Sequence, residues 1–498
     1  MTRRVVVVGA GITGLVAARR LRAETDAEII VCESSARLGG KLYRLDLDDV
    51  TELDQQPGSE HRPTDVGQVE ASDRDQRNVP FAVDVGAESL LARRPEGLEL
   101  ISELGLDDQR VHPTGARAQA FLDGEIRPLP PSNMGIPTDL DALEGYLTAE
   151  GLRRARTEVD LEAPVFAGDV EIGRYVAERF GDEVADRVLE PMLGGVYAGQ
   201  SRRLSFEAVH PALFAEARQG GSLLTAAQRV AAAARRSNDH ADGVAPPVFA
   251  GLVGGVGGLV TALSADLERR GVKILTRTTV RSLSRTSTGY ELITGPVPRP
   301  DLIMADRVLL ATPAAPTARL LKELSPEAAA GLGQIPYASM AVITFVLAGA
   351  SLEGSGLLVP PGELPTIKAF TYSFNKWDWI KDRAEAEFGP GTAVVRASVG
   401  RFGEEQLLQV DDQELARRTL AEAREFVPGW RSATPVRMRV QRWGGGLPQY
   451  LLGHRRRIAD IRAAVSELDG VAVAGAYADG VGLPACMASA TAAADTLR

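Results

Sequence analysis

Residues 4–41 constrain the fold of this chain more than any other stretch. Four consecutive valines, residues 5–8, predict a strand that is buried on both faces. The strand runs into Gly9, Gly11 and Gly14, a G-x-G-x-x-G turn that opens a helix. The first glycine permits the tight turn, the second lets backbone approach a pyrophosphate, and the third lets helix pack on strand. The pattern therefore predicts a βαβ unit whose helix N-terminus binds phosphate groups.

An acid follows at the spacing that such a unit requires. A second apolar run, residues 29–32, ends at Glu33, about 20 residues beyond the glycines, where an acid accepts hydrogen bonds from ribose hydroxyls. Strand, helix and acid together favour a dinucleotide site over a plain βαβ turn. The residues expected to contact the dinucleotide are Gly9, Ala10, Gly11, Ile12, Thr13, Gly14, Glu33 and Ser34.

A second glycine motif indicates which dinucleotide is bound. Arg37, Gly40 and Lys41 belong to an R-x-G-G-K sequence just beyond the acid. This sequence resembles the FAD-binding oxidoreductases of the amine oxidase, phytoene desaturase and protoporphyrinogen oxidase superfamily. The resemblance implies FAD as the cofactor, with the glycine pair letting the chain bend back over the pyrophosphate. The alternative is an ordinary loop after the second strand.

Composition excludes several other classes of function. The 498 residues carry a net charge of −10, which argues against general nucleic-acid binding. Two cysteines, Cys32 and Cys486, suggest neither a disulfide framework nor a zinc site, and five histidines without paired spacing make a metal centre improbable. The longest uncharged apolar stretch, residues 340–352, is too short to span a bilayer. We expect a cytoplasmic protein, with peripheral membrane contact left open.

Two hairpins are expected in the N-terminal third. The strands at residues 42–47 and 80–85 flank residues 48–79, which are polar, acidic and rich in Pro and Gly and so predict a flexible insertion. The second hairpin, residues 121–126, has apolar residues around Asp-Gly. Arg117 lies just upstream, where some porphyrinogen oxidases have an arginine that pairs with a substrate propionate. The alternative for Arg117 is a solvated strand residue.

Further contacts to the flavin follow from the resemblance. Gly86, Ala87 and Glu88 occupy the turn that passes the ribityl and pyrophosphate region in relatives. Val280 matches the position whose backbone meets the adenine, and Trp443 matches an aromatic position near the flavin.

Two motifs narrow the resemblance to the porphyrinogen oxidases. Residues 191–200 read PMLGGVYAGQ, and residues 447–454 read LPQYLLGH. The glycines of the first motif predict a close turn with Gly195 and Tyr197 on a surface suited to a planar ligand, or else a turn between core helices. Arg437 and Arg439 alternate with Met438 and Val440 and so share one sheet face, which is either solvent or the mouth of a cavity.

The C-terminal motif, residues 471–490, predicts a buried strand, a glycine turn and a final helix near Leu483 and Pro484. By resemblance, the N–H groups of Val481, Gly482 and Leu483 face the flavin. The dipole of the helix would then stabilise the negative charge that appears on reduction.

The resemblance covers nearly the whole chain apart from the insertion. It implies an α/β fold with a discontinuous, Rossmann-like FAD-binding domain, a mixed-sheet substrate domain and a helical domain. The expected boundaries are residues 1–90, 248–325 and 444–498 for the FAD domain, 91–115 and 326–443 for the substrate domain, and 116–247 for the helical domain.

The chain is thus identified as a member of the bacterial coproporphyrinogen/protoporphyrinogen oxidases of haem biosynthesis. That family implies a porphyrinogen substrate, O2 as oxidant and H2O2 as product, with ferrochelatase as a transient partner. High Ala, Arg, Gly and Val content suggests a GC-rich bacterial source, whose relatives oxidise coproporphyrinogen III. Open alternatives are protoporphyrinogen IX as substrate, another FAD amine oxidase or desaturase, and a non-catalytic flavoprotein partner. No catalytic acid or base is assigned.

The composition of the insertion generates a first prediction. Residues 54–77 cannot bury enough apolar surface to offset the entropy of ordering them. We expect a variant with a short Gly/Ser linker in their place to retain its FAD content and turnover, both measured on purified protein. Collapse of either quantity would mean that the segment folds over the cofactor or caps the cavity.

Overall fold

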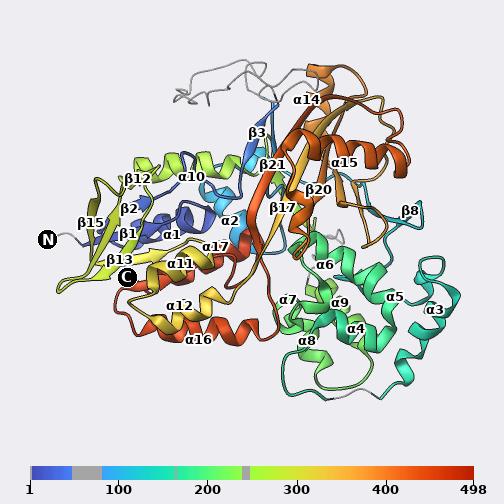
Figure 1. Ribbon diagram of the computed structural model, residues 1–498, viewed down its shortest axis with the longest axis horizontal. Helices are drawn as coiled ribbons and strands as arrows, with labels where there is room; N and C mark the ends of the chain where they lie inside the picture. Colours follow the sequence, from blue (N-terminus) through green and yellow to red (C-terminus); the bar gives the residue numbers. More distant parts are fainter. Residues whose placement is uncertain (1–2, 48–80, 163–164, 238–246) are drawn as a thin grey trace.

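A five-stranded parallel sheet carries the glycine motif. The computed structural model describes residues 3–47, 81–162, 165–237 and 247–498 (Figure 1), so the predicted insertion lies outside the described residues. The sheet order is β12-β2-β1-β16-β22. Its strands are β1 (Arg4–Val8), β2 (Glu28–Cys32), β12 (Lys273–Leu275), β16 (Arg307–Leu310) and β22 (Val471–Val473). Segments from the beginning, middle and end of the chain therefore meet in one sheet.

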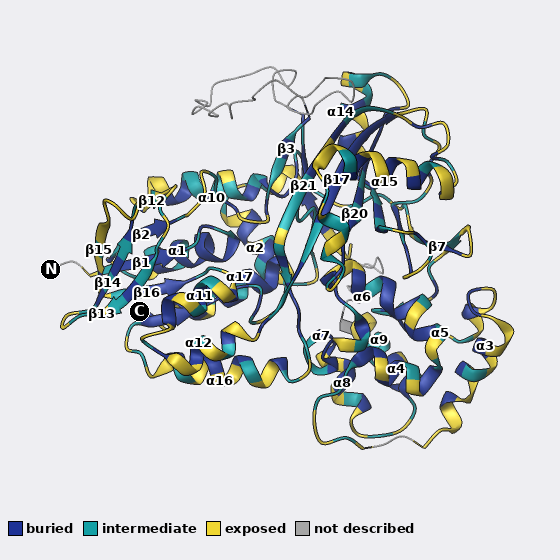
Figure 2. Cartoon of the chain, viewed as in Figure 1, coloured by how far each residue is buried: buried dark blue, intermediate teal, exposed yellow. Residues whose placement is uncertain are grey.

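Helices cover both faces of this sheet, as the valine run predicted. Figure 2 shows helices on both sides of these strands. All four valines of β1 are buried, and alternate ones belong to different apolar clusters. One cluster contains residues of α1 (Ile12–Glu24), α10 (Gly258–Arg269) and α17 (Leu483–Asp495). The other contains residues of α11 (Ala314–Leu321), α12 (Pro326–Gly333) and α16 (His454–Ser466). The sheet and its helices thus form a doubly covered α/β layer.

A seven-stranded mixed sheet stands beside the first in the order β21-β17-β20-β19-β18-β7-β8 (Figure 1). Its strands are β7 (Ala118–Leu122), β8 (Glu125–Pro128), β17 (Tyr337–Ala348), β18 (Gly356–Leu358), β19 (Ile367–Tyr372), β20 (Ala393–Val399) and β21 (Thr434–Pro448). One face packs on α15 (Asp412–Phe426) through an aromatic and aliphatic core.

Both predicted hairpins are present. β3 (Arg44–Asp46) pairs antiparallel with β4 (Ala82–Asp84). β7 and β8 are joined by Asp123 and Gly124, whose φ angles are 54° and 78°. Positive φ at both central residues is the geometry that the Asp-Gly pair favours in a two-residue hairpin.

The third region is helical, and the predicted turn in it lies at the C-terminal end of a helix, after Gly194 and Gly195. Residues 190–197 form helix α6 (Glu190–Tyr197), so Gly194 and Gly195 lie inside a helix. The chain reverses only at Ala198, which is left-handed with a φ of 48°. Gly195 faces the sheet, and an added Cβ would make an ordinary van der Waals contact with a Leu358 methyl group at 3.5 Å. The domain boundaries given above remain predictions.

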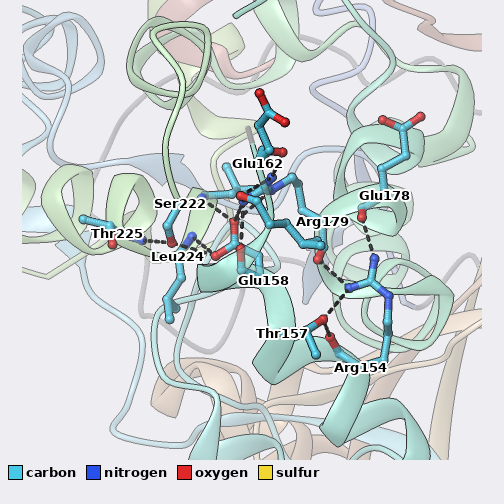
Figure 3. Close-up of polar contacts among 11 residues, drawn as sticks. Arg154, Thr157, Glu158, Glu162, Glu178, Arg179, Ser222, Leu224 and Thr225 are labelled. Atoms are coloured by element: carbon cyan, nitrogen blue, oxygen red, sulfur yellow. Dashed lines mark hydrogen bonds and ion pairs between the residues drawn. The ribbon is translucent and has the colours of Figure 1, made fainter. Parts of the chain in front are cut away.

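A buried ion pair holds this helical region together. Glu158 is fully buried in the short helix η4 (Thr157–Asp160), and Arg179 of α4 (Ile172–Phe180) is 3% exposed. The Arg179 guanidinium donates to Glu158 Oε1 at 2.6 and 2.9 Å (Figure 3). The same carboxylate accepts from Ser222 Oγ and from the Leu223 N–H, both at 2.6 Å, at the start of α9 (Leu223–Ser237). One carboxylate therefore joins three helices.

No helix of the described residues is long and apolar enough to cross a membrane.

The Glu158–Arg179 pair generates a second prediction. Removal of one partner leaves the other charge buried and uncompensated, so we expect Arg179→Met to lower the free energy of unfolding by about 3–5 kcal/mol. The matched control is Arg153→Met, which breaks an exposed pair with Glu150 and should cost less than about 1 kcal/mol. Chemical denaturation of both variants measures the difference. Equal losses would contradict a structural role for the buried pair.

Candidate active site

A cavity of about 870 Å³ opens between the carboxyl edge of the parallel sheet, the seven-stranded sheet and helix α6. It lies at the edge where ligands bind in open α/β sheets. Most of the predicted contact residues line it together. These are Gly9, Gly11, Ile12, Thr13, Glu33, Ser34, Gly40, Lys41, Gly86, Ala87, Gly195, Val280, Trp443, Val481 and Leu483.

The glycine turn has the geometry of a phosphate cradle. A Cβ on Gly14 would lie 1.8 Å from the Gly9 carbonyl oxygen, so only glycine lets α1 pack this closely on the turn. A Cβ on Gly11 would meet nothing within 4 Å, which leaves its cavity side open to a ligand. Helix α1 has no side-chain cap and no acid in its first turn. Its first N–H groups are therefore suited to an anionic oxygen.

Glu33 is fixed at the rim of this cradle. Its Oε2 accepts from the Ala10 N–H and its Oε1 from the Ser35 N–H, both at 2.9 Å. The Gly39 N–H donates to the Ala10 carbonyl at 2.8 Å and so joins the R-x-G-G-K loop to the turn. Ala10 and Gly14 themselves lie behind the lining, where they hold the cradle in shape.

A hydrogen-bonded wall surrounds Trp443. Its Nε1 donates to the Val85 carbonyl at 3.0 Å, and the Arg396 guanidinium donates to the Gly86 carbonyl at 2.8 Å. Gly86 is required here because a Cβ would lie 2.0 Å from the Lys41 carbonyl oxygen. Arg37 lies outside the lining, with its guanidinium 5.8 Å from the Trp443 ring centre.

Glu88 supports this wall from behind and does not line the cavity. It accepts from Lys376 Nζ at 2.7 Å and Ser373 Oγ at 2.6 Å, and it lies 3.4 Å from Arg396. Burial alone would raise the pKa of Glu88, but the charges of Lys376 and Arg396 and these hydrogen bonds lower it to about 2. Glu88 is thus a permanent anion that holds Arg396 against the Gly86 carbonyl.

The C-terminal helix closes the other side. α17 begins at Leu483, with Pro484 in its first turn as predicted and no side-chain cap at Gly482. Val481 and Leu483 line the cavity, and Gly482 lies just outside the lining. Two uncapped helix N-termini, those of α1 and α17, therefore border one cavity. This arrangement suits a ligand that carries negative charge at two separate places.

A flavin fits these residues, and the comparisons with known proteins name the family. The model for flavin containing amine oxidoreductases matches residues 12–498. The chain belongs to this flavin-dependent family.

Within the family, the porphyrinogen oxidases are the similar group. The chain is 33% identical to the coproporphyrinogen III oxidase of Mycobacterium tuberculosis, over 98% of this chain and 96% of that protein. It is 26% identical to the coproporphyrinogen III oxidase of Bacillus subtilis, over 97% of this chain and 96% of that protein. A solved structure from Exiguobacterium sp. 255-15, ascribed to the protoporphyrinogen oxidases, has a TM-score of 0.78 and 28% identity, and covers 100% of this chain and 99% of its own.

In this chain, the L-P-Q-Y-x-x-G-H motif joins two cavity walls. Gln449 Nε2 donates to the carbonyl of Tyr197, at the end of α6, at 2.8 Å. The Tyr450 hydroxyl donates to the Ala476 carbonyl, and His454 Nε2 to the Tyr477 carbonyl at 2.8 Å. Ala476 and Tyr477 line the cavity near α17. The sequence identified the motif by resemblance but did not predict this positioning role.

His454 makes its hydrogen bond to the Tyr477 carbonyl as a neutral imidazole. Its imidazole stacks on the Tyr450 ring with centroids 4.1 Å apart. Burial lowers the pKa of His454 to about 4, so at neutral pH the ring carries one proton and donates through Nε2. Tyr197 also packs here, 5.5 Å from the Tyr450 ring, and lies outside the lining.

The three predicted arginines lie elsewhere. Arg117 and Arg439 are exposed, and Arg437 packs 5.9 Å from the Phe388 ring centre; none of them lines the cavity. A substrate role for them remains a prediction of the sequence.

Sequence reasoning missed the polar residues that the seven-stranded sheet contributes. Lys368 and Thr371 of β19 and Arg396 and Ser398 of β20 line the cavity. No local motif marks them, because strands β19 and β20 bring them together across the sheet. The one sequence signal for strand β19 is the alternation within residues 367–372, in which Phe370 and Tyr372 are buried.

Glu33 generates a third prediction. Because its carboxylate lies at the rim of the cradle, Glu33→Ala should weaken flavin binding by about 1.5–3 kcal/mol, the range for a hydrogen bond to a charged group. Flavin titration into the apoprotein measures the change, and activity at saturating flavin should largely recover. The control is Glu28→Ala, at the start of β2, the strand that ends just before Glu33; Glu28 is paired with Arg4 and Lys273. An unchanged dissociation constant for Glu33→Ala would show that the acid has no part in binding.

Proposed function

We propose that the protein is an FAD-dependent oxidase that converts coproporphyrinogen III to coproporphyrin III in the cytoplasm, with O2 as oxidant and H2O2 as product. The observation that carries the proposal is the continuity of one cavity. It runs from the glycine turn, past Trp443, to the face of the seven-stranded sheet and Gly195. A dinucleotide cofactor and a large second ligand can therefore share it.

FAD is favoured over a smaller flavin because both ends of a dinucleotide have matching residues. Glu33 and Val280 lie in the lining with the glycine turn, where a ribose and an adenine are expected. Lys41 adds a positive charge beside the turn, where the pyrophosphate is expected. Trp443 and the α17 N-terminus provide an aromatic surface and a positive dipole for the ring system.

The protein's own residues position the cofactor and the substrate and keep water away from them. When bound, FAD supplies the redox chemistry by accepting a hydride from a porphyrinogen carbon. The N–H groups at the start of α17 would stabilise negative charge on the bound cofactor. Apolar lining residues such as Met340, Val342 and Leu447 exclude water from the reacting centre. Six hydrogens leave in three rounds, and three O2 become three H2O2.

Relatives support coproporphyrinogen III as the substrate. Proteins named coproporphyrinogen III oxidase include the mycobacterial one, at 33% identity over almost the full length of both chains. A second candidate is protoporphyrinogen IX, favoured by a human relative named protoporphyrinogen oxidase that is 28% identical over 99% of this chain.

The proposal generates a fourth prediction. The purified protein should carry FAD that acid precipitation releases. Cys32 and Cys486 line the cavity, but burial raises the pKa of these thiols to about 12 and about 11, so neither is an activated nucleophile for a covalent link. On one preparation, kcat/KM for coproporphyrinogen III should exceed that for protoporphyrinogen IX, and H2O2 should form in a ratio of three per porphyrin. A reversed preference would assign the second candidate. Absence of oxidation with both substrates would overturn the oxidase proposal.

A further inference from the structure

Lys368 is placed in the cavity by an irregularity of strand β19. Ile367 pairs with Val399 of β20, and Ala369 pairs with the adjacent Ser398, so the register shifts around Lys368. An extra residue of this kind is a β-bulge, and bulges re-aim a side chain next to active sites. Here the bulge puts two consecutive residues, Lys368 and Ala369, in the lining of the cavity.

The Lys368 ammonium has an incomplete set of partners. The residue is 4% exposed, and its Nζ donates to the Gly400 carbonyl at 2.7 Å. Among the residues that the structure describes, that is its one hydrogen bond, and no carboxylate pairs with it. An ammonium group has three donors, so two remain for a ligand in the cavity.

The second cation of this sheet face has a different environment. Arg396 is held by Glu88 and by the Gly86 carbonyl, so its charge is already compensated within the protein. Lys368 has no such compensation. Burial and the neighbouring Arg401 lower the pKa of its ammonium to about 7, while Glu404 opposes the shift. A buried cation of this kind is stabilised when an anion arrives beside it.

We propose that Lys368 binds a carboxylate of the tetrapyrrole substrate, an inference that rests on the proposed function. Coproporphyrinogen III carries four propionates, one on each pyrrole ring. Every orientation of the tetrapyrrole therefore places at least one propionate on the side away from the flavin. The bulge places one buried ammonium, that of Lys368, in the part of the cavity lined by the seven-stranded sheet. A charge-assisted hydrogen bond there would anchor one propionate and fix the position of the ring.

Lys368→Met tests the inference, because methionine has similar length and no charge. Loss of a charge-assisted contact should raise both KM for coproporphyrinogen III and the dissociation constant of coproporphyrin III by about tenfold or more. Fluorescence quenching measures the dissociation constant without turnover. At saturating substrate, kcat should stay within about threefold of the wild type, since positioning through one of four propionates is expected to affect binding most.

The matched control is Lys381→Met, which removes an exposed lysine from α14 (Asp378–Phe388) and should change neither constant. Flavin content and thermal stability of each variant confirm folding. If Lys368→Met binds the porphyrin as tightly as the wild type does, the inference is overturned. If kcat also collapses while binding is unchanged, Lys368 acts in proton transfer and not in binding. A wild type that oxidises no porphyrinogen would overturn the proposed function and this inference together.

Discussion

The close packing of helix α1 on its own turn is the constraint on which the site depends. Because a Cβ at Gly14 would overlap the Gly9 carbonyl at 1.8 Å, the helix can approach the sheet only with glycine there. That approach directs the free N–H groups of α1 into the cavity. The carboxyl ends of the parallel strands β1, β2 and β16 meet at the same edge, where Val8, Cys32 and Ala311 line the cavity. The chain therefore returns repeatedly to one edge to complete a single site.

The second wall is built by a different kind of contact. The seven-stranded sheet and helix α6 are held against the flavin-binding layer by Gln449, Tyr450 and His454, each of which donates to a backbone carbonyl. These side chains do not touch the cavity. They fix the distance between α6 on one side and the Ala476–Tyr477 turn on the other. We infer that the motif typical of the porphyrinogen oxidases sets the width of the cavity, while the glycine turns set its phosphate end.

The sequence predicted what is encoded locally. The glycine turn, Glu33, the Asp-Gly hairpin and the start of α17 each depend on a few adjacent residues, and each lies where the pattern indicated. Within residues 191–200 the glycines did not locate the turn, because Gly194 and Gly195 lie in α6 and the chain reverses at Ala198. Lys368 and Arg396 were missed because strand pairing and a bulge place them, and neither leaves a local signature.

The central claim is that one cavity holds a flavin and a porphyrinogen together, so that electrons pass directly between them. Anaerobic mixing of the purified protein with coproporphyrinogen III in a stopped-flow spectrophotometer tests this claim most directly. The account predicts that the visible flavin absorbance bleaches in a single turnover without oxygen, and that it returns when O2 is admitted. An unchanged flavin spectrum, with porphyrinogen oxidised at the same rate as in buffer, would contradict it.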